Sequence, residues 1–169
     1  MITRNEVDQL FEYRDGDLYW RTNPSPKSAV DISKPAGTIK TKDYRYIVYK
    51  GKRHAAHRLI YLLHNPGWDI TDISKTNTID HRDNDKHNNN IDNLRIATAG
   101  EQKHNAVLMR NNTSGHKGVS WNKACGKWRV RVMMDGTYQY GGHFTDLDKA
   151  AAKAAEMREM LHGEYVNHG

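Results

Sequence analysis

The chain has 169 residues, a net charge of +6 and an isoelectric point near 9.4. Its length fits one ordinary domain or two to three small ones. Only 37% of the residues are hydrophobic and Phe occurs twice, which argues against a single large core and favours small sheet-based modules. The excess of basic residues favours a polyanionic partner.

Cysteine usage and hydropathy exclude further classes. Cys125 is the only cysteine, so an internal disulfide and a cysteine-rich zinc site are excluded. No apolar run reaches membrane-spanning length, and the first five residues do not resemble a secretory signal. We therefore expect no membrane partner and a reducing, cytoplasmic setting.

The first predicted segment, residues 1–64, is expected to be α+β and to support the segment after it in the chain. Turn residues and alternating apolar residues divide it into short elements. These are a helix over 6–13, a strand over 17–21, a loop over 23–35, a hairpin of 44–49 with 53–56, and a helix over 57–64.

The second segment, residues 65–112, consists of a polar linker and a short module over 78–109. Ile79 is expected in a strand that carries Asp80 and His81 at its end. Thr98 and Glu101 have the spacing of a capping box, so a helix is predicted to begin there. The residues between them are rich in Asp and Asn and are expected to form loops and turns.

The third segment, residues 113–169, predicts three strands followed by one helix. The strands are expected over 117–122, 128–133 and 138–144, with a tight turn at Asp135-Gly136. Thr145 or Asp146 can cap the helix, and Gly163 can end it. Between residues 110 and 144 there are six Lys or Arg and one acid, which gives a local charge of +5.

The middle strand of this segment alternates between two kinds of side chain. Because successive residues of a strand point to opposite faces, one face should be apolar and the other basic. The apolar face is expected to pack on the helix through Leu147, Ala150, Ala154 and Met157. Arginine on the basic face can reach base edges or phosphates, and tyrosine can stack or donate to phosphate.

The Asp80-His81 pair is the strongest chemical signal in the sequence. An acid beside a histidine, followed by amides at fixed distances, fits a one-metal phosphodiesterase. In such a site the carboxylate holds a divalent cation, the imidazole deprotonates water, and the amides fix the geometry.

Residues 79–105 resemble the HNH endonuclease family in the Asp-His pair, in Asn93-Leu94 about twelve residues later, and in the polar start of a helix. The resemblance implies a ββα-metal module that binds one magnesium-like ion. It assigns Asp80 as a metal ligand, His81 as the general base, and Asn93 as the residue that buttresses the loop orienting His81. The supporting or substitute positions are Asn89, His104, Asn105, and the His57-Arg58 pair that such proteins place at the start of a helix.

One position departs from the family pattern. Gln102 stands where the family usually has a ligating Asn or His. Its amide oxygen can ligate a hard cation, but the additional methylene displaces that oxygen, and catalytic geometry is sensitive to such shifts.

Residues 113–165 resemble the apetala-two or ethylene-response-factor type of DNA-binding domain. The resemblance rests on Gly118 to Trp121, Gly126 to Trp128, Gly142 to Phe144 and the alanine-rich helix. Family members lay the three-stranded sheet into the major groove. Arg131 and Ser120 differ from common family residues, so sequence preference does not transfer. The expected DNA-contacting residues are Lys117, Ser120, Trp121, Asn122, Lys123, Arg129, Arg131, Met133, Tyr138 and Tyr140.

Taken together, these patterns predict an α+β protein with a ββα-metal module and a three-stranded antiparallel sheet packed on one helix. The expected function is a DNA endonuclease of homing or nicking type that uses one Mg or Mn ion. The expected partner is double-stranded DNA, bound by a monomer that needs no small-molecule cofactor, in a host cytoplasm if the chain is phage-encoded. The alternative is a DNA-binding or regulatory protein that kept the scaffold while losing catalysis. A third interpretation, an RNA-binding module, finds only Tyr138 and Tyr140 for base stacking.

Overall fold

A computed structural model describes residues 2–24, 30–39, 44–105 and 108–166. The chain divides into two compact units, Met1–Thr98 and Ala99–Gly169, which we call the first and the second unit. The division falls inside the segment 65–112 that the sequence suggested as one module. Part of the predicted loop over 23–35 lies outside the described residues.

The first unit begins with a short helix and a hairpin. Helix α1 (Arg4–Leu10) is capped by Thr3 and Glu6 in a reciprocal capping box. Strands β1 (Phe11–Arg14) and β2 (Asp17–Trp20) then pair antiparallel across a turn whose two residues have positive φ. The predicted helix over 6–13 was therefore wrong in its second half. Phe11 instead pairs with Trp20 in the hairpin, and the two rings lie 4.3 Å apart.

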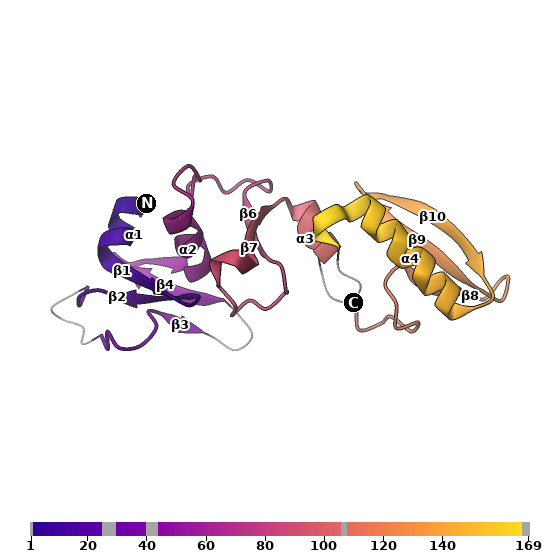
Figure 1. The fold of residues 1–169 in the computed structure, drawn as a ribbon, viewed down its shortest axis with the longest axis horizontal. Coiled ribbons are helices and arrows are strands. Elements are labelled where there is room, and N and C mark those ends of the chain that lie inside the picture. The colour runs from indigo at the N-terminus through magenta and orange to yellow at the C-terminus, as the bar shows by residue number, and fades with distance from the viewer. Residues whose placement is uncertain (1, 25–29, 40–43, 106–107, 167–169) are drawn as a thin grey trace. The chain divides into compact units, whose positions relative to one another are not determined.

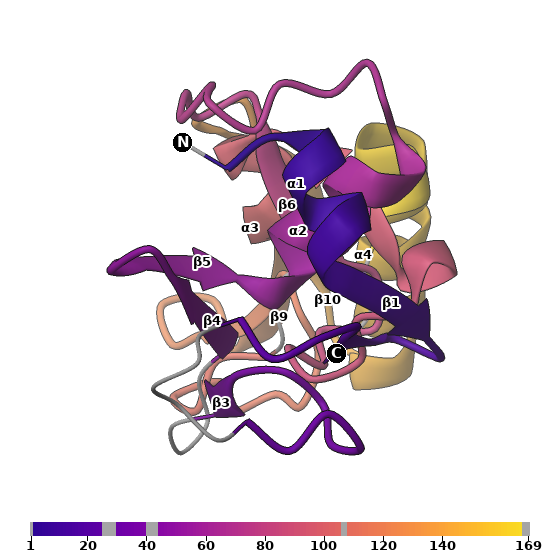
Figure 2. The same ribbon diagram turned by 90° about the vertical axis from the view of Figure 1, so that its left-hand side faces the viewer.

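A second sheet carries the predicted hairpin, which is confirmed. Its order is β3 (Thr38–Ile39), β4 (Arg45–Tyr49) and β5 (Lys52–Ala55), and β3 was not predicted. Lys50 and Gly51 at the turn both have positive φ, as a tight hairpin turn requires. Helix α2 (Ala56–His64) follows β5 directly, and Figure 2 shows the hairpin leading into it.

The third sheet of the first unit is the hairpin of β6 (Thr78–His81) and β7 (Leu94–Ala97), with the short 3-10 helix η1 (Ile91–Asn93) before β7. Ile79 and Leu94 are buried in the same hydrophobic core as Phe11, Leu18 and Leu59. Residues 1–64 and the β6–β7 hairpin therefore share one core and fold as one body.

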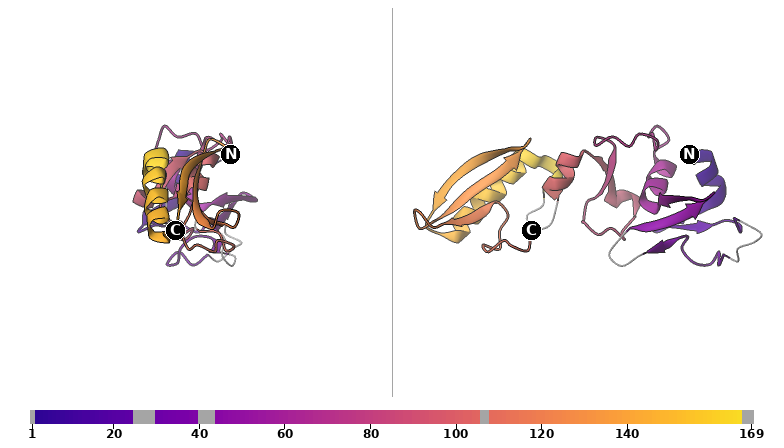
Figure 3. Two further views of the ribbon diagram at one scale, coloured as in Figure 1. Left: turned by 90° about the vertical axis from the view of Figure 1, so that its right-hand side faces the viewer. Right: turned by 180° about the vertical axis from the view of Figure 1, so that it is seen from behind.

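The second unit contains the predicted three strands and helix. Helix α3 (Ala99–Asn105) precedes β8 (Val119–Asn122), β9 (Lys127–Met134) and β10 (Thr137–Phe144), which form an antiparallel sheet in the order β10-β9-β8. Helix α4 (Leu147–His162), followed by η2 (Gly163–Tyr165), lies along one face of this sheet (Figures 1 and 3). The α+β fold class is confirmed.

The predicted ends of α4 are also confirmed, because Asp146 caps its start and Gly163 ends it. The predicted apolar face of the sheet packs on α4 through Val119, Val130 and Val132, which form a core with Ala150, Ala154 and Met157. A β-bulge lies between Tyr140 and Gly142 on β10. Among the described residues, no helix has the length and apolarity needed to cross a membrane.

Candidate functional site

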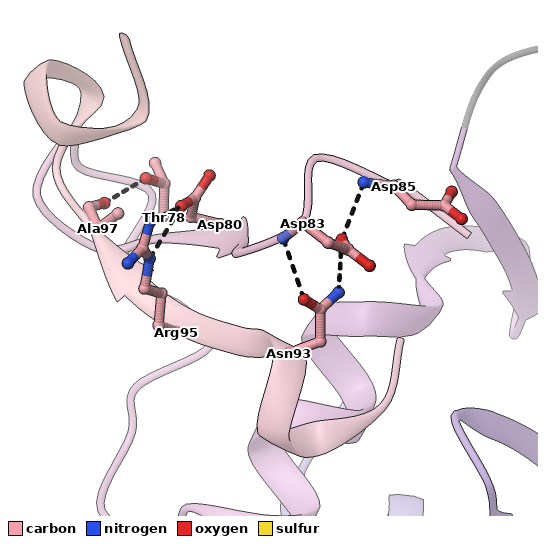
Figure 4. Close-up of polar contacts among 7 residues, drawn as sticks. All are labelled: Thr78, Asp80, Asp83, Asp85, Asn93, Arg95 and Ala97. Atoms are coloured by element: carbon pink, nitrogen blue, oxygen red, sulfur yellow. Dashed lines mark hydrogen bonds and ion pairs between the residues drawn. The ribbon is translucent and has the colours of Figure 1, made fainter. Parts of the chain in front are cut away.

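Asp80 lies near the end of β6 and makes an ion pair across the hairpin. The β6–β7 register places Asp80 opposite Arg95. The Nε and Nη2 atoms of Arg95 lie 3.0 and 2.9 Å from Oδ2 of Asp80 (Figure 4). Both residues are buried, with exposed fractions of 8% for Asp80 and 6% for Arg95. The carboxylate is therefore held in a fixed orientation by a guanidinium that is itself fixed on a strand.

His81, the next residue, is buried and oriented by an amide. Its Nε2 lies 3.0 Å from Oδ1 of Asn89, which is also buried. An amide oxygen only accepts hydrogen bonds, so the ring proton lies on Nε2, which donates to Asn89. In the neutral ring Nδ1 is then the basic nitrogen, the atom suited to accept a proton from water.

A cluster of rings surrounds His81. His57, from the start of α2, contacts it edge-on with ring centroids 5.3 Å apart, and Tyr44 lies 4.7 Å from His57 and 5.9 Å from His81. Burial, together with the neighbouring His81 and Arg58, lowers the pKa of His57 to about 3. His57 is therefore a neutral ring at physiological pH and adds no positive charge beside His81.

The low pKa of His57 makes the stability of the first unit depend on pH. Between about 6.5, the pKa of an unperturbed histidine, and about 3, the unfolded chain binds a proton that the folded chain does not. Stability should therefore fall as pH falls through this window, by up to about 1.4 kcal/mol per pH unit. His57→Phe keeps a ring in place but cannot titrate, so its slope between pH 6.5 and 5 should be shallower. Amide hydrogen exchange in α2 measures this, and equal slopes in both proteins would refute it.

The loop between β6 and η1 is held together by one carboxylate and two amides. Asn93 donates from Nδ2 to Oδ1 of Asp83 at 2.8 Å and accepts from the Asp83 backbone N–H at 3.1 Å (Figure 4). Oδ1 of Asp83 also accepts from the backbone N–H of Asp85 at 2.9 Å, and Oδ2 accepts from Asn88 at 2.7 Å. Asn93 thus fastens both ends of the loop that carries Asn89, the hydrogen-bond partner of His81.

The side chain of Arg58, a predicted supporting residue, contacts other residues of the first unit. Its guanidinium donates to the carbonyls of Ile70, Asp72 and Asn77 and lies 4.8 Å above the Trp68 ring. These contacts fasten the loop between α2 and β6. They give Arg58 a structural role within the first unit.

The remaining predicted nuclease residues lie in the second unit. Gln102 is half-buried on α3, and Asn105 is fully buried at its end. The ring of His104 stacks on His162 of α4 with centroids 3.8 Å apart. Asp80 and His81 belong to the first unit, as do Arg95, Asn89, His57 and Tyr44, which contact them.

The predicted basic face of the C-terminal sheet is present, and most predicted contact residues share it. The register of β8, β9 and β10 places on one face, opposite α4, the residues Ser120, Asn122, Arg129, Arg131, Met133, Tyr138 and Tyr140. Arg131 lies over the Tyr138 ring at 4.7 Å, and Arg129 approaches Oγ of Ser120 at 3.4 Å. No acidic residue stands on this face of the three strands.

Three predicted contact residues lie elsewhere. Trp121 is opposite Trp128 and in phase with Val119, so it belongs to the α4 side of the sheet. Lys117 precedes β8 and is partly buried, and burial together with nearby Arg158 lowers its pKa to about 8. Lys123 is exposed in the turn after β8.

Sequence reasoning missed Arg95, Tyr44 and His143. Arg95 could have been found from the sequence if the hairpin register had been known, because that register pairs it with Asp80. His143 lies on the basic face, where Nδ1 is 2.5 Å from the hydroxyl of Tyr140 and Nε2 is 2.9 Å from Nδ2 of Asn122. Tyr44 carries no local motif, and only the fold brings its ring to His57.

The donor chemistry at Asp80 fits a hard divalent cation. Mg²⁺ is commonly bound by one or two carboxylates together with substrate phosphates. Asp80 supplies such a carboxylate, and its Oδ2 is paired with the guanidinium of Arg95. Among the described residues, no three His, Cys, Asp or Glu side chains gather into a metal-binding cluster. Asp80, which precedes His81 on the same strand, is therefore considered as a ligand by itself and not as part of such a cluster.

The comparisons with known proteins agree with this arrangement. The family model of the HNH endonuclease matches residues 54–104, which include His57, Asp80, His81, Asn93 and Gln102. The chain belongs to the HNH endonuclease family, a nuclease family whose domain implies DNA as the substrate.

Protein 3.8 of Escherichia phage T7 is 37% identical to this chain over 94 residues, which cover 56% of this chain and 77% of that protein. No solved structure matches the chain.

Proposed function

We propose that this protein is a metal-dependent DNA endonuclease of homing or nicking type, targeted by the basic face of its C-terminal sheet. The observation that carries the proposal is the order Asp80-His81 on one strand end within the matched HNH segment, with both side chains buried and oriented. The HNH membership supports phosphodiester hydrolysis, and the phage relative supports a host cytoplasm as the setting.

In this proposal His81 removes the proton from the attacking water through Nδ1, because Nε2 is engaged by Asn89. The water oxygen then attacks phosphorus, and the bond to the leaving sugar oxygen breaks. Asp80 would hold one Mg or Mn ion, which supplies Lewis-acid charge at the phosphate and the leaving oxygen. Gln102 is the second proposed ligand, with His104 and Asn105 as the alternatives on the same helix.

Asn93 acts in this scheme through the loop. Its hydrogen bonds to Asp83 and to the carbonyl of Asn88 fix the segment from which Asn89 reaches His81. His57 and Tyr44 pack against the imidazole and restrict its rotation. Positioning of this kind matters because small misplacements of a catalytic group cost large factors in rate.

The proposed targeting element is the face of the second unit that carries Arg129, Arg131, Tyr138 and Tyr140. Its basic and aromatic side chains, without acids among them, suit a phosphate backbone and base edges. The local charge of +5 between residues 110 and 144 supports the same partner.

A supercoiled plasmid distinguishes the endonuclease from the regulatory alternative. The purified full chain should convert supercoiled plasmid to open circles with magnesium or manganese, and a chelator should stop the conversion. DNA binding in a gel shift without any relaxation would instead establish the protein as a DNA-binding regulator that retains the HNH scaffold.

A further inference from the structure

The ion pair between Asp80 and Arg95 has a consequence for how the protein handles a cation. A buried carboxylate and a buried guanidinium face each other with two nitrogen–oxygen contacts of 3.0 and 2.9 Å. Their charges cancel. Both contacts are to Oδ2, so a metal ion held by the Asp80 carboxylate would share that carboxylate with Arg95.

The residues around His81 described above add no negative charge. His57 is neutral, since its pKa is about 3, and Asn89 contributes an uncharged amide. Between Thr78 and Ala97 the chain has four acids and three bases, so the hairpin and its loop are close to neutral. Asp83, the first acid of the loop after β6, accepts hydrogen bonds from Asn88, Asn93 and a backbone N–H.

Repulsion between like charges at short distance is large where water is excluded. A dication held by Asp80 would be repelled by the guanidinium of Arg95, which contacts the same carboxylate. DNA changes this balance, because each phosphate at the site adds a negative charge.

We propose that Arg95 is a built-in counter-ion of Asp80 that keeps the affinity of the DNA-free protein for divalent cations low. Cation binding is thereby coupled to DNA binding, and the metal is acquired together with the substrate. Arg95 acts through Asp80 and is a positioning residue. This inference rests on the proposed function in one respect, namely that Asp80 is a metal ligand.

The test is thermal unfolding of the full chain with and without Mn²⁺, in the absence of DNA. The melting temperature of the natural protein should change little with the ion. Arg95→Gln should melt lower without Mn²⁺, because it leaves a buried carboxylate without its cation. Saturating Mn²⁺ should then raise the melting temperature of Arg95→Gln by roughly 5 °C or more. Electron paramagnetic resonance should show Mn²⁺ binding about tenfold tighter than in the natural protein.

Three further variants make the result specific. Arg95→Lys keeps the positive charge and should stay insensitive to Mn²⁺. Arg45→Gln removes another ion pair of the same unit, Arg45 Nε to Asp17 Oδ1 at 3.2 Å, and should show no Mn²⁺ response. Adding Asp80→Asn to Arg95→Gln should abolish the response, since the carboxylate is then absent.

Duplex DNA provides a second measurement that needs no variant. Mn²⁺ affinity of the natural protein should rise by about tenfold or more when a duplex is bound. The counter-ion role is overturned if Arg95→Gln binds Mn²⁺ more weakly than the natural protein, or if the duplex leaves the affinity unchanged. Plasmid relaxation is measured separately. If the natural protein relaxes DNA but Arg95→Gln binds Mn²⁺ no more tightly, the counter-ion role is refuted and the proposed endonuclease function stands. If Arg95→Gln binds Mn²⁺ more tightly but the natural protein does not relax DNA, the counter-ion role is supported and the endonuclease function is refuted.

Discussion

His81→Ala is expected to reduce plasmid relaxation by roughly 10²–10⁴-fold, the range of general acid–base catalysis. The physical reason is the arrangement at the end of β6. Asn89 holds the proton on Nε2, and His57 and Tyr44 hold the ring, so Nδ1 is the base that the variant removes. The measurement is the single-turnover rate of nicking at saturating protein and metal.

The control for this variant is His87→Ala. His87 is exposed in the same loop, and its hydrogen bonds to Asp85 and Asn89 use backbone atoms, so its ring can be removed without disturbing them. His87→Ala should nick at the natural rate. Free imidazole should partly restore His81→Ala, which a merely unfolded variant would not allow. Undiminished cleavage by His81→Ala would show that His81 is not the general base.

The second large effect is expected on DNA binding. Replacing both Arg129 and Arg131 with alanine should weaken duplex binding by roughly 10- to 10³-fold. It should also reduce the slope of log affinity against log salt by about two, because each arginine that contacts phosphate releases about one counterion. Gel shifts or fluorescence anisotropy at several salt concentrations measure both quantities.

A charge-matched control lies on the other side of the sheet. Lys149 and Lys153 belong to α4, which covers the opposite face. Their double alanine variant loses the same two positive charges and should keep most of its affinity. If the two double variants bind equally well, general charge attracts the DNA and the sheet face is not the contact surface.

The C-terminal unit was predictable because its local signals agree with one another. Strands β8 to β10 are separated by turn residues, and the middle strand alternates apolar and basic side chains. Helix α4 has a cap residue at its start and a glycine at its end. Where local signals conflicted, prediction failed. Phe11 to Tyr13 continue the helical pattern of α1. These residues instead form a strand, because pairing with Asp17 to Trp20 buries Phe11.

The part of the site that lies within the Asp-His motif and the loop after it was predictable from the sequence. The strand bearing Asp80 and His81 and the turn-rich loop after it are where the sequence placed them. Arg95 escaped notice because its contact depends on the hairpin register, and a shift of one residue would have pointed it elsewhere. Tyr44 and His57 meet His81 only through tertiary packing, which no local pattern encodes.

The bulge in β10 bears on how relatives of this protein should be compared. Gly141 is the additional residue of the bulge, and a side chain there would collide with Met157 and Val130. Because of this additional residue, Tyr140 and His143 lie on the same face of the sheet although they are three residues apart in the sequence. A relative that lacks one of the two glycines would have regular alternation and would keep the same faces. A one-residue gap at this position of an alignment is therefore neutral, whereas a side chain larger than hydrogen at Gly141 marks a different packing of the helix on the sheet.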